Sequence, residues 1–132
     1  MYYSDKMYTA VNGADMGIEK QNSNIMCPAQ ATLEVLGGKW KGLILFHLSD
    51  GTKKRFTQLK RLIPGITQRM LTKQLRELEA DKVVRREIFQ EVPPKVEYAL
   101  TKFGLTLSPI LEALHKWGKE YIDEINKIRN NG

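Results

Sequence analysis

The chain has 132 residues and a mass of 15.2 kDa, which is the size of one ordinary domain. Its 42% hydrophobic and 27% charged residues exclude a disordered or fibrous protein. No stretch approaches the roughly 20 apolar residues of a membrane-spanning helix. The single cysteine excludes an intrachain disulfide and a cysteine-built zinc site. These features predict a cytoplasmic protein.

The positive charge is concentrated in one segment. The whole chain carries a net charge of +6, whereas residues 39–86 contain thirteen basic and four acidic residues, a net of +9. Such a concentration favours a polyanionic partner over a generally charged surface. A solvated charged face remains the alternative until a binding motif is identified in this segment.

The N-terminal part divides into an arm and the start of a folded domain. Residues 1–24 show no sustained hydrophobic period and are predicted to be a mobile arm, with one winged helix-turn-helix domain over 25–132. Pro28 suits the first position of a helix, which places Cys27 at its N-cap and Gly37-Gly38 at its end. A second helix is expected over about 39–48.

Two further helices are separated by a short turn. After a turn at 49–51 and a short strand at Arg55-Phe56, Thr57 is expected to cap a helix that stops at Pro64-Gly65. The next helix, over 67–81, has Thr67 as its N-cap. Leucines at 71, 75 and 78 form its apolar face, and Met70 and Leu71 are predicted to be core residues.

The hydrophobic period then changes. Residues 84–89 have strand composition and residues 95–100 alternate, so they predict a hairpin joined through 90–94. A final helix is expected over 105–128, preceded or capped by Thr101. Its apolar stripe exceeds what a small domain covers alone, which favours dimerisation together with region 29–36. The alternative is that the stripe packs on its own core. The predicted dimerisation residues are Leu107, Leu111, Leu114, Trp117, Tyr121 and Ile125.

A helix-turn-helix followed by a two-stranded hairpin is the winged-helix arrangement. The predicted fold class is therefore α+β and mostly helical, with terminal dimerisation helices. In this arrangement the 67–81 helix enters the DNA major groove. The predicted DNA-binding residues on this helix are Thr67, Gln68, Arg69, Thr72, Lys73 and Arg76. Further candidate phosphate contacts are Arg55, Lys60, Lys39 and, near the hairpin tip, Lys95.

Several motifs give this chain a family resemblance. They are the Cys-Pro opening, GGKW, RF-x-x-L, ITQRMLTKQLRELE, and PPKVEY followed by LT-x-x-G. Residues 27–117 thereby resemble the HxlR-type, MarR-like winged-helix transcriptional regulators of prokaryotes. The resemblance implies a dimeric DNA-binding repressor or activator without enzymatic activity. One departure is Lys82, where the family commonly has a glycine, so Lys82 must close the preceding helix.

Cys27 has two interpretations. A sulfur at a helix N-terminus lies at the positive end of the helix dipole, which favours the thiolate and lowers the thiol pKa. The resemblance implies a redox or electrophile sensor here, since some members of the family use this cysteine in that way. A structural, half-buried cysteine is the alternative, and both remain open. Because the chain has one cysteine, any disulfide must join it to a second subunit or a small thiol.

Other chemistry lacks support in the sequence. His47 and His115 have no third ligand at metal-site spacing, and neither a nucleophile elbow nor a glycine-rich phosphate loop occurs. We therefore expect no metal, no cofactor and no enzyme. The expected partners are double-stranded DNA with a near-palindromic operator and a second copy of the chain, in the cytoplasm at the nucleoid. No small-molecule effector is identified. A winged-helix protein-interaction module and a non-specific architectural DNA binder remain alternatives.

Overall fold

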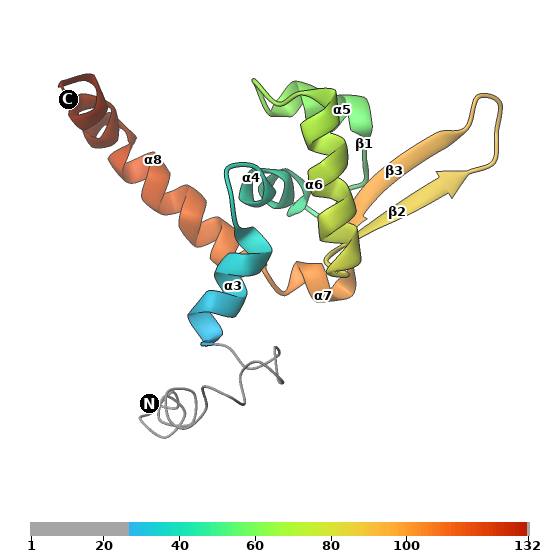
Figure 1. Ribbon diagram of the computed structural model, residues 1–132, viewed down its shortest axis with the longest axis horizontal. Coiled ribbons are helices and arrows are strands. Elements are labelled where there is room, and N and C mark those ends of the chain that lie inside the picture. Colours follow the sequence, from blue (N-terminus) through green and yellow to red (C-terminus); the bar gives the residue numbers. More distant parts are fainter. Residues whose placement is uncertain (1–26, 132) are drawn as a thin grey trace, which may run out of the picture. The chain divides into compact units, whose positions relative to one another are not determined.

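The computed structural model describes residues 27–131, and the arm expected over residues 1–24 lies outside them. The chain divides into two compact units, one that ends at Gly37 and one that begins at Gly38. The described part of the first unit contains α3 (Pro28–Leu36). The second contains α4 (Lys41–Leu48), β1 (Lys54–Arg55), α5 (Phe56–Leu62), α6 (Gln68–Ala80), β2 (Val84–Phe89), β3 (Lys95–Leu100), α7 (Lys102–Leu105) and α8 (Ser108–Asn131) (Figure 1). This set of helices and strands confirms the predicted α+β, mostly helical fold class.

Helix α3 begins where the sequence predicts. Cys27 is the N-cap residue and Pro28 occupies the first helical position, where its missing N–H has no cost. The backbone N–H of Ala31 donates to the carbonyl oxygen of Cys27 at 3.0 Å, which closes the first turn. None of the nine residues of α3 is buried, and Leu33 is 66% exposed.

The core of the second unit lies among α4, α5, α6 and the inner ends of the strands. The predicted apolar face of α6 is confirmed, because Leu71, Leu75 and Leu78 are all buried. The sharp turn that precedes α6 uses Gly65, whose φ of 89° is readily adopted only by glycine. The buried apolar side chains are Ile44, Leu45, Leu48, Leu59, Ile63, Ile66, Leu71, Leu75, Leu78, Val83, Val84, Ala99, Leu100 and Leu111.

The entry to α5 differs from the sequence expectation. The helix begins at Phe56, so Thr57 is not its cap. The backbone N–H of Arg55 instead donates to the side-chain Oε1 of Gln58 at 2.9 Å. The short strand also lies one residue earlier than expected, and its residues Lys54 and Arg55 pair with β3. The sheet therefore has three antiparallel strands in the order β1-β3-β2.

Both ends of α6 are closed by defined hydrogen bonds. The hydroxyl of Thr67 accepts from the backbone N–H of Met70 at 3.0 Å, which confirms Thr67 as the N-cap. At the other end Lys82 has a φ of 64°, and its N–H donates to the carbonyl of Glu79 at 3.0 Å. The N–H of Val83 donates to the carbonyl of Leu78 at 3.2 Å, which completes a Schellman motif. Lys82 thus adopts the left-handed conformation without being a glycine.

Strands β2 and β3 form the predicted wing. Their register runs from Val84 opposite Leu100 to Phe89 opposite Lys95. Figure 1 shows that the loop between them lies beyond the helices of this unit, and Val92 within the loop is 99% exposed.

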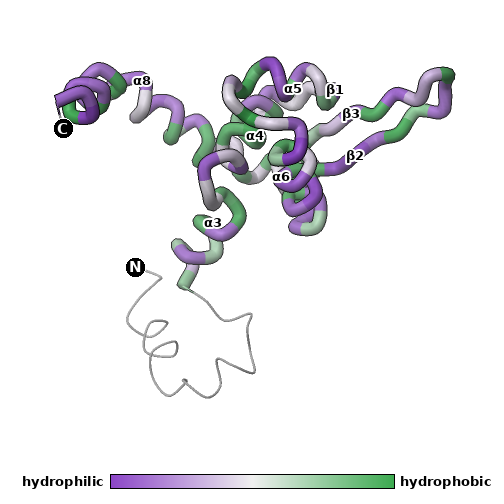
Figure 2. The backbone as a smooth tube through the Cα atoms, turned by 45° about the horizontal axis from the view of Figure 1, so that its top comes forward, coloured by the Kyte–Doolittle hydropathy of each residue, from purple (hydrophilic) through white to green (hydrophobic). Residues whose placement is uncertain are grey.

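The C-terminal region contains two helices where the sequence predicts one. The hydroxyl of Thr101 accepts from the backbone N–H of Gly104 at 2.9 Å and caps the short α7. Residues 106–107 form a turn before α8 begins at Ser108. Figure 2 shows hydrophobic and hydrophilic residues alternating along α8. No helix within residues 27–131 is long and apolar enough to cross a membrane.

Candidate nucleic-acid interface

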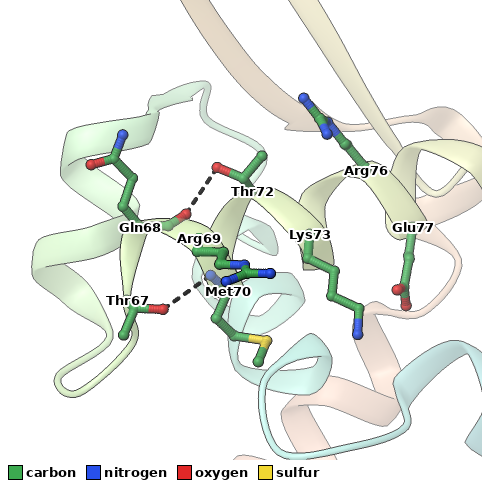
Figure 3. Close-up of a pocket in the computed structure, with 8 residues that line it drawn as sticks. All are labelled: Thr67, Gln68, Arg69, Met70, Thr72, Lys73, Arg76 and Glu77. Carbon is green, nitrogen blue, oxygen red and sulfur yellow. Dashed lines mark hydrogen bonds between the residues drawn. The ribbon is translucent and has the colours of Figure 1, made fainter.

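Helix α6 presents an open polar groove on the side opposite its buried leucines. All six residues that the sequence assigns to DNA binding on this helix border the groove. Figure 3 shows its lining residues, which are Thr67, Gln68, Arg69, Met70, Thr72, Lys73, Arg76 and Glu77. The helix is therefore fixed to the core on one side and offers a continuous set of polar groups on the other.

The cations of α6 are available to a ligand. Arg69, Lys73 and Arg76 are exposed, and none of them forms an ion pair within residues 27–131. Gln68 is also exposed at the first turn. Thr72 is half-buried, and its hydroxyl donates to the carbonyl oxygen of Gln68 at 2.9 Å. Its hydrogen is thus used within the helix, while its oxygen keeps the capacity to accept.

Two lining residues were not assigned to this surface from the sequence. Met70, expected in the core, is half-buried and borders the groove, and its sulfur accepts from the Gln74 amide at 3.2 Å. Glu77 Oε1 lies 2.7 Å from Lys41 Nζ on α4. The hydrogen bond from Lys41 lowers the pKa of Glu77 below its ordinary value. The sequence signal for Glu77 is its position four residues after Lys73, on the same helix face.

The predicted phosphate contacts outside α6 lie on three different elements. Arg55 is the exposed last residue of β1, and Lys60 is exposed on α5. Lys39 precedes α4, with its Nζ 4.6 Å from the centroid of the Trp40 ring. These three cations retain solvent access, although the structure does not gather them into one cluster with α6.

The cations of the wing are largely occupied. Lys95 lies at the outer end of the hairpin as predicted, but it is half-buried, with Nζ 4.6 Å from the Phe89 ring centroid and 4.0 Å from Glu97 Oε2. Glu87 Oε1 lies 2.8 Å from Lys53 Nζ and 3.1 Å from Arg85 Nη1. Hydrogen bonds from Lys53 and then Arg85 lower the pKa of Glu87. Positive charge is therefore more available on α6 than on the wing.

Both histidines contact the ring of Phe46, His47 from within α4 and His115 from α8. The rings of Phe46 and His115 stack with centroids 4.7 Å apart, and His47 meets Phe46 edge-on at 5.3 Å. Burial, followed by the charge of Lys54, lowers the pKa of His47. In the described part of the chain, no group of three or more His, Cys, Asp or Glu side chains is arranged to hold a metal ion.

The predicted dimerisation residues, which lie on α8 except for Leu107 in the turn before it, do not share one environment. Leu111 is 1% exposed and packs in the core of this unit, unlike the exposed members of the set. Leu107 and Ile125 are half-buried. The exposed members are Leu114 at 55%, Trp117 at 59% and Tyr121 at 41%, and the rings of the last two contact each other at a tilt of 39°, with centroids 5.0 Å apart. Cys27, the candidate redox residue, is half-buried at the start of α3.

Comparison with known proteins agrees with this geometry. The HxlR-like helix-turn-helix family matches residues 35–126. The chain belongs to this HxlR-like family. The uncharacterized HTH-type transcriptional regulators YdeP and YybR of Bacillus subtilis (strain 168) are similar to it. YdeP is 57% identical over 102 residues, covering 77% of this chain and 79% of YdeP, and YybR is 56% identical over 106 residues, covering 80% and 84%. The HxlR-like chain is thus a helix-turn-helix transcriptional regulator.

Solved structures extend the comparison to the fold. The redox regulator HypR in its reduced form is 55% identical and matches with a TM-score of 0.70, covering 76% of this chain and 98% of HypR. HypR in its oxidized form is 58% identical with a TM-score of 0.68, covering 71% and 96%. The reduced form of the transcriptional regulator YodB from B. subtilis is 38% identical with a TM-score of 0.62, covering 73% and 94%. These matches confirm the winged-helix fold of this HxlR-like regulator.

Proposed function

We propose that this HxlR-like regulator binds double-stranded operator DNA as a homodimer, with α6 in the major groove. The observation that carries the proposal is the set of exposed cations on α6, which form no ion pair with any residue of the described range 27–131 and lie opposite a buried leucine face. Arginine and glutamine side chains pair with base edges, whereas lysine at this position also suits phosphate. Arg69 and Gln68 are proposed to contact bases. Thr72, Lys73 and Arg76 are proposed to contact a mixture of bases and phosphates.

The second copy is proposed to cover α8. Leu114, Trp117 and Tyr121 expose large apolar surfaces that a solitary subunit leaves in water, and burial of apolar area favours association. Two-fold symmetry then places the two α6 helices on half-sites about 34 Å apart, so the operator is a near-palindrome. The protein acts at the nucleoid without a cofactor or catalytic activity. A signal changes the spacing of the two α6 helices.

Fluorescence anisotropy tests the DNA interface. The probe is a labelled duplex from upstream of the gene for this chain, with a scrambled duplex as competitor. Arg69→Ala is expected to lower operator affinity by a factor of about ten or more, as for loss of a base contact worth roughly 1–3 kcal/mol. Arg129→Ala, at the exposed end of α8, is the matched control and should leave the affinity unchanged.

The same titration separates the alternatives. Equal loss on operator and scrambled DNA makes Arg69 a phosphate contact. Equal affinity of the wild type for both duplexes favours an architectural DNA binder. Weak binding without salt dependence, together with a tight acidic protein partner, favours an interaction module, because phosphate contacts make affinity fall steeply with salt.

Analytical ultracentrifugation tests the dimer. Leu114→Glu should shift the chain toward monomer, since it places a charge in an apolar interface while altering an exposed position of the protomer. Lys119→Glu changes an exposed polar position of the same helix and should leave the dimer intact. If Leu114→Glu forms the dimer at the same protein concentrations as the wild type, the proposed α8 interface is wrong.

Cys27 is proposed to make DNA binding responsive to thiol oxidation. HypR, with structures in oxidized and reduced forms, is named a redox regulator, and a diamide-treated form of YodB is also similar to this chain. Two Cys27 thiols would form one intersubunit disulfide, releasing two protons and passing two electrons to diamide. Binding lost under diamide in the wild type and retained in Cys27→Ser supports this role. Wild-type binding that diamide does not change supports the structural role of Cys27.

A further inference from the structure

An ion pair joins the first residue of α4 to the groove of α6. Lys41 Nζ and Glu77 Oε1 lie 2.7 Å apart, and the Lys41 side chain is only 14% exposed whereas that of Glu77 is 43% exposed. Lys41 is therefore covered by its surroundings, while Glu77 remains at the surface of the groove. Lys41 lies outside the set of residues that line the groove.

Glu77 shares its side of α6 with Lys73. Figure 3 shows the two side chains projecting in the same direction, one turn apart, with Arg76 on the other side of the helix. Residues four apart on a helix are close enough to form an ion pair. The hydrogen bond and charge of Lys41 lower the pKa of Glu77 most, and the charge of Lys73 contributes in the same direction but less. Two lysines thus compete for one carboxylate, and Lys41 is the one that holds it.

We infer that Lys41 acts on DNA binding through Glu77, by holding this carboxylate so that Lys73 remains available to DNA. This inference rests on the proposed function of α6. Lys41 is a positioning residue, because it acts through Glu77 and does not itself line the groove.

Two consequences follow from removal of the Lys41 ammonium. Glu77 becomes able to pair with Lys73, since a lysine and a glutamate at this spacing attract each other even in the less favourable order. Glu77 also places an uncompensated negative charge beside DNA phosphates, which repel it. Both effects weaken DNA binding, and both require the carboxylate of Glu77.

A double-mutant cycle tests this dependence. Operator affinity is measured by anisotropy over a range of salt concentrations for the wild type, Lys41→Met, Glu77→Gln and the double variant. Lys41→Met is expected to weaken binding about fivefold, within the usual range of coupled neighbours. It should also reduce the steepness of the plot of log affinity against log salt by about one, as for one lost phosphate contact. Glu77→Gln is expected to raise affinity, and adding Lys41→Met to it should change neither quantity further.

Controls separate this mechanism from charge loss and misfolding. Lys102→Met removes one exposed positive charge outside the groove and should leave the salt dependence unchanged. Thermal unfolding without DNA verifies that all variants are folded. If Lys41→Met lowers operator affinity equally in the wild-type and the Glu77→Gln backgrounds, Lys41 is a direct phosphate contact and the inference is wrong. A loss of affinity in Glu77→Gln alone overturns it as well. Wild-type protein that binds no DNA overturns the proposed function itself, and the inference with it.

Discussion

Gly104 provides the most direct test of how the C-terminal helices attach to the wing. It is buried in α7, and a β-carbon there would lie 3.0 Å from the carbonyl carbon of Val83, 3.3 Å from its Cα, and closer still to its carbonyl oxygen. These are backbone atoms of a residue that is 1% exposed, so they cannot swing aside as a flexible side chain would. The same carbonyl oxygen accepts from the Thr101 N–H at 3.0 Å, which ties β3 and α7 to this point.

Gly104→Ala must therefore shift α7 or break this contact. Overpacking of this kind costs about 1–3 kcal/mol, and we expect a value near the upper end, about 2–3 kcal/mol, because the contact is with backbone. For a unit of this size the loss corresponds to a melting temperature lowered by about 10 °C or more.

Urea unfolding followed by tryptophan fluorescence, at one fixed protein concentration, measures this loss. Gly118→Ala is the matched control, because a β-carbon at Gly118 would meet no atom within 4 Å. The free energy of unfolding of Gly118→Ala should equal that of the wild type or exceed it by up to about 1 kcal/mol, since alanine favours helix more than glycine does. If Gly104→Ala is as stable as the wild type, α7 does not pack on Val83 as described.

Three further predictions concern caps and a titrating group. Thr67→Ala removes the acceptor for the Met70 N–H and should cost about 1 kcal/mol in urea unfolding, whereas Thr67→Ser should retain most of the stability; equal losses in the two would exclude a capping role. Lys82→Gly relieves a left-handed residue at φ 64°, so its free energy of unfolding in urea should rise by about 1 kcal/mol at most, and a lower free energy of unfolding would contradict strain there. The backbone N–H of Thr52, with its hydroxyl and Lys54, lowers the pKa of Asp50 from 3.8 to about 2. Its stabilisation is therefore present above pH 3.8 and lost as the pH falls through about 2. The difference in stability between wild type and Asp50→Asn should shrink from pH 6 to pH 2, and a constant difference would exclude this linkage.

The elements with a clean hydrophobic period are the ones that the sequence predicts well. In α6 the spacing of Leu71, Leu75 and Leu78 defines the buried face, and the N-cap at Thr67 follows from its side-chain oxygen. In β3 the alternation before Leu100 defines a strand. Both signals are local, so tertiary packing has little opportunity to override them.

The boundary between α7 and α8 is not encoded in the same way. The apolar spacing continues through Leu107 and predicts one helix, although residues 106–107 form a turn. The interruption depends on Thr101, which caps a short helix, and on the approach of Gly104 to Val83, a residue far away in the sequence. The spacing of Leu111 is the same as that of the exposed apolar residues of α8. Spacing alone therefore does not distinguish this buried residue from them.

Net charge by segment indicates the proposed DNA-binding region but does not rank its cations. The thirteen basic residues over 39–86 are equivalent in a count, whereas the structure places five of them in ion pairs, namely Lys41, Lys53, Lys54, Arg85 and Arg86. A partner for Lys41 cannot be read from sequence spacing, because Glu77 lies on another helix. Pairing leaves Arg69, Lys73 and Arg76 as the cations of α6 that are available to DNA. If the proposed interface is correct, the carboxylates of this segment matter for recognition too, since their ion pairs determine which positive charges remain for the phosphates.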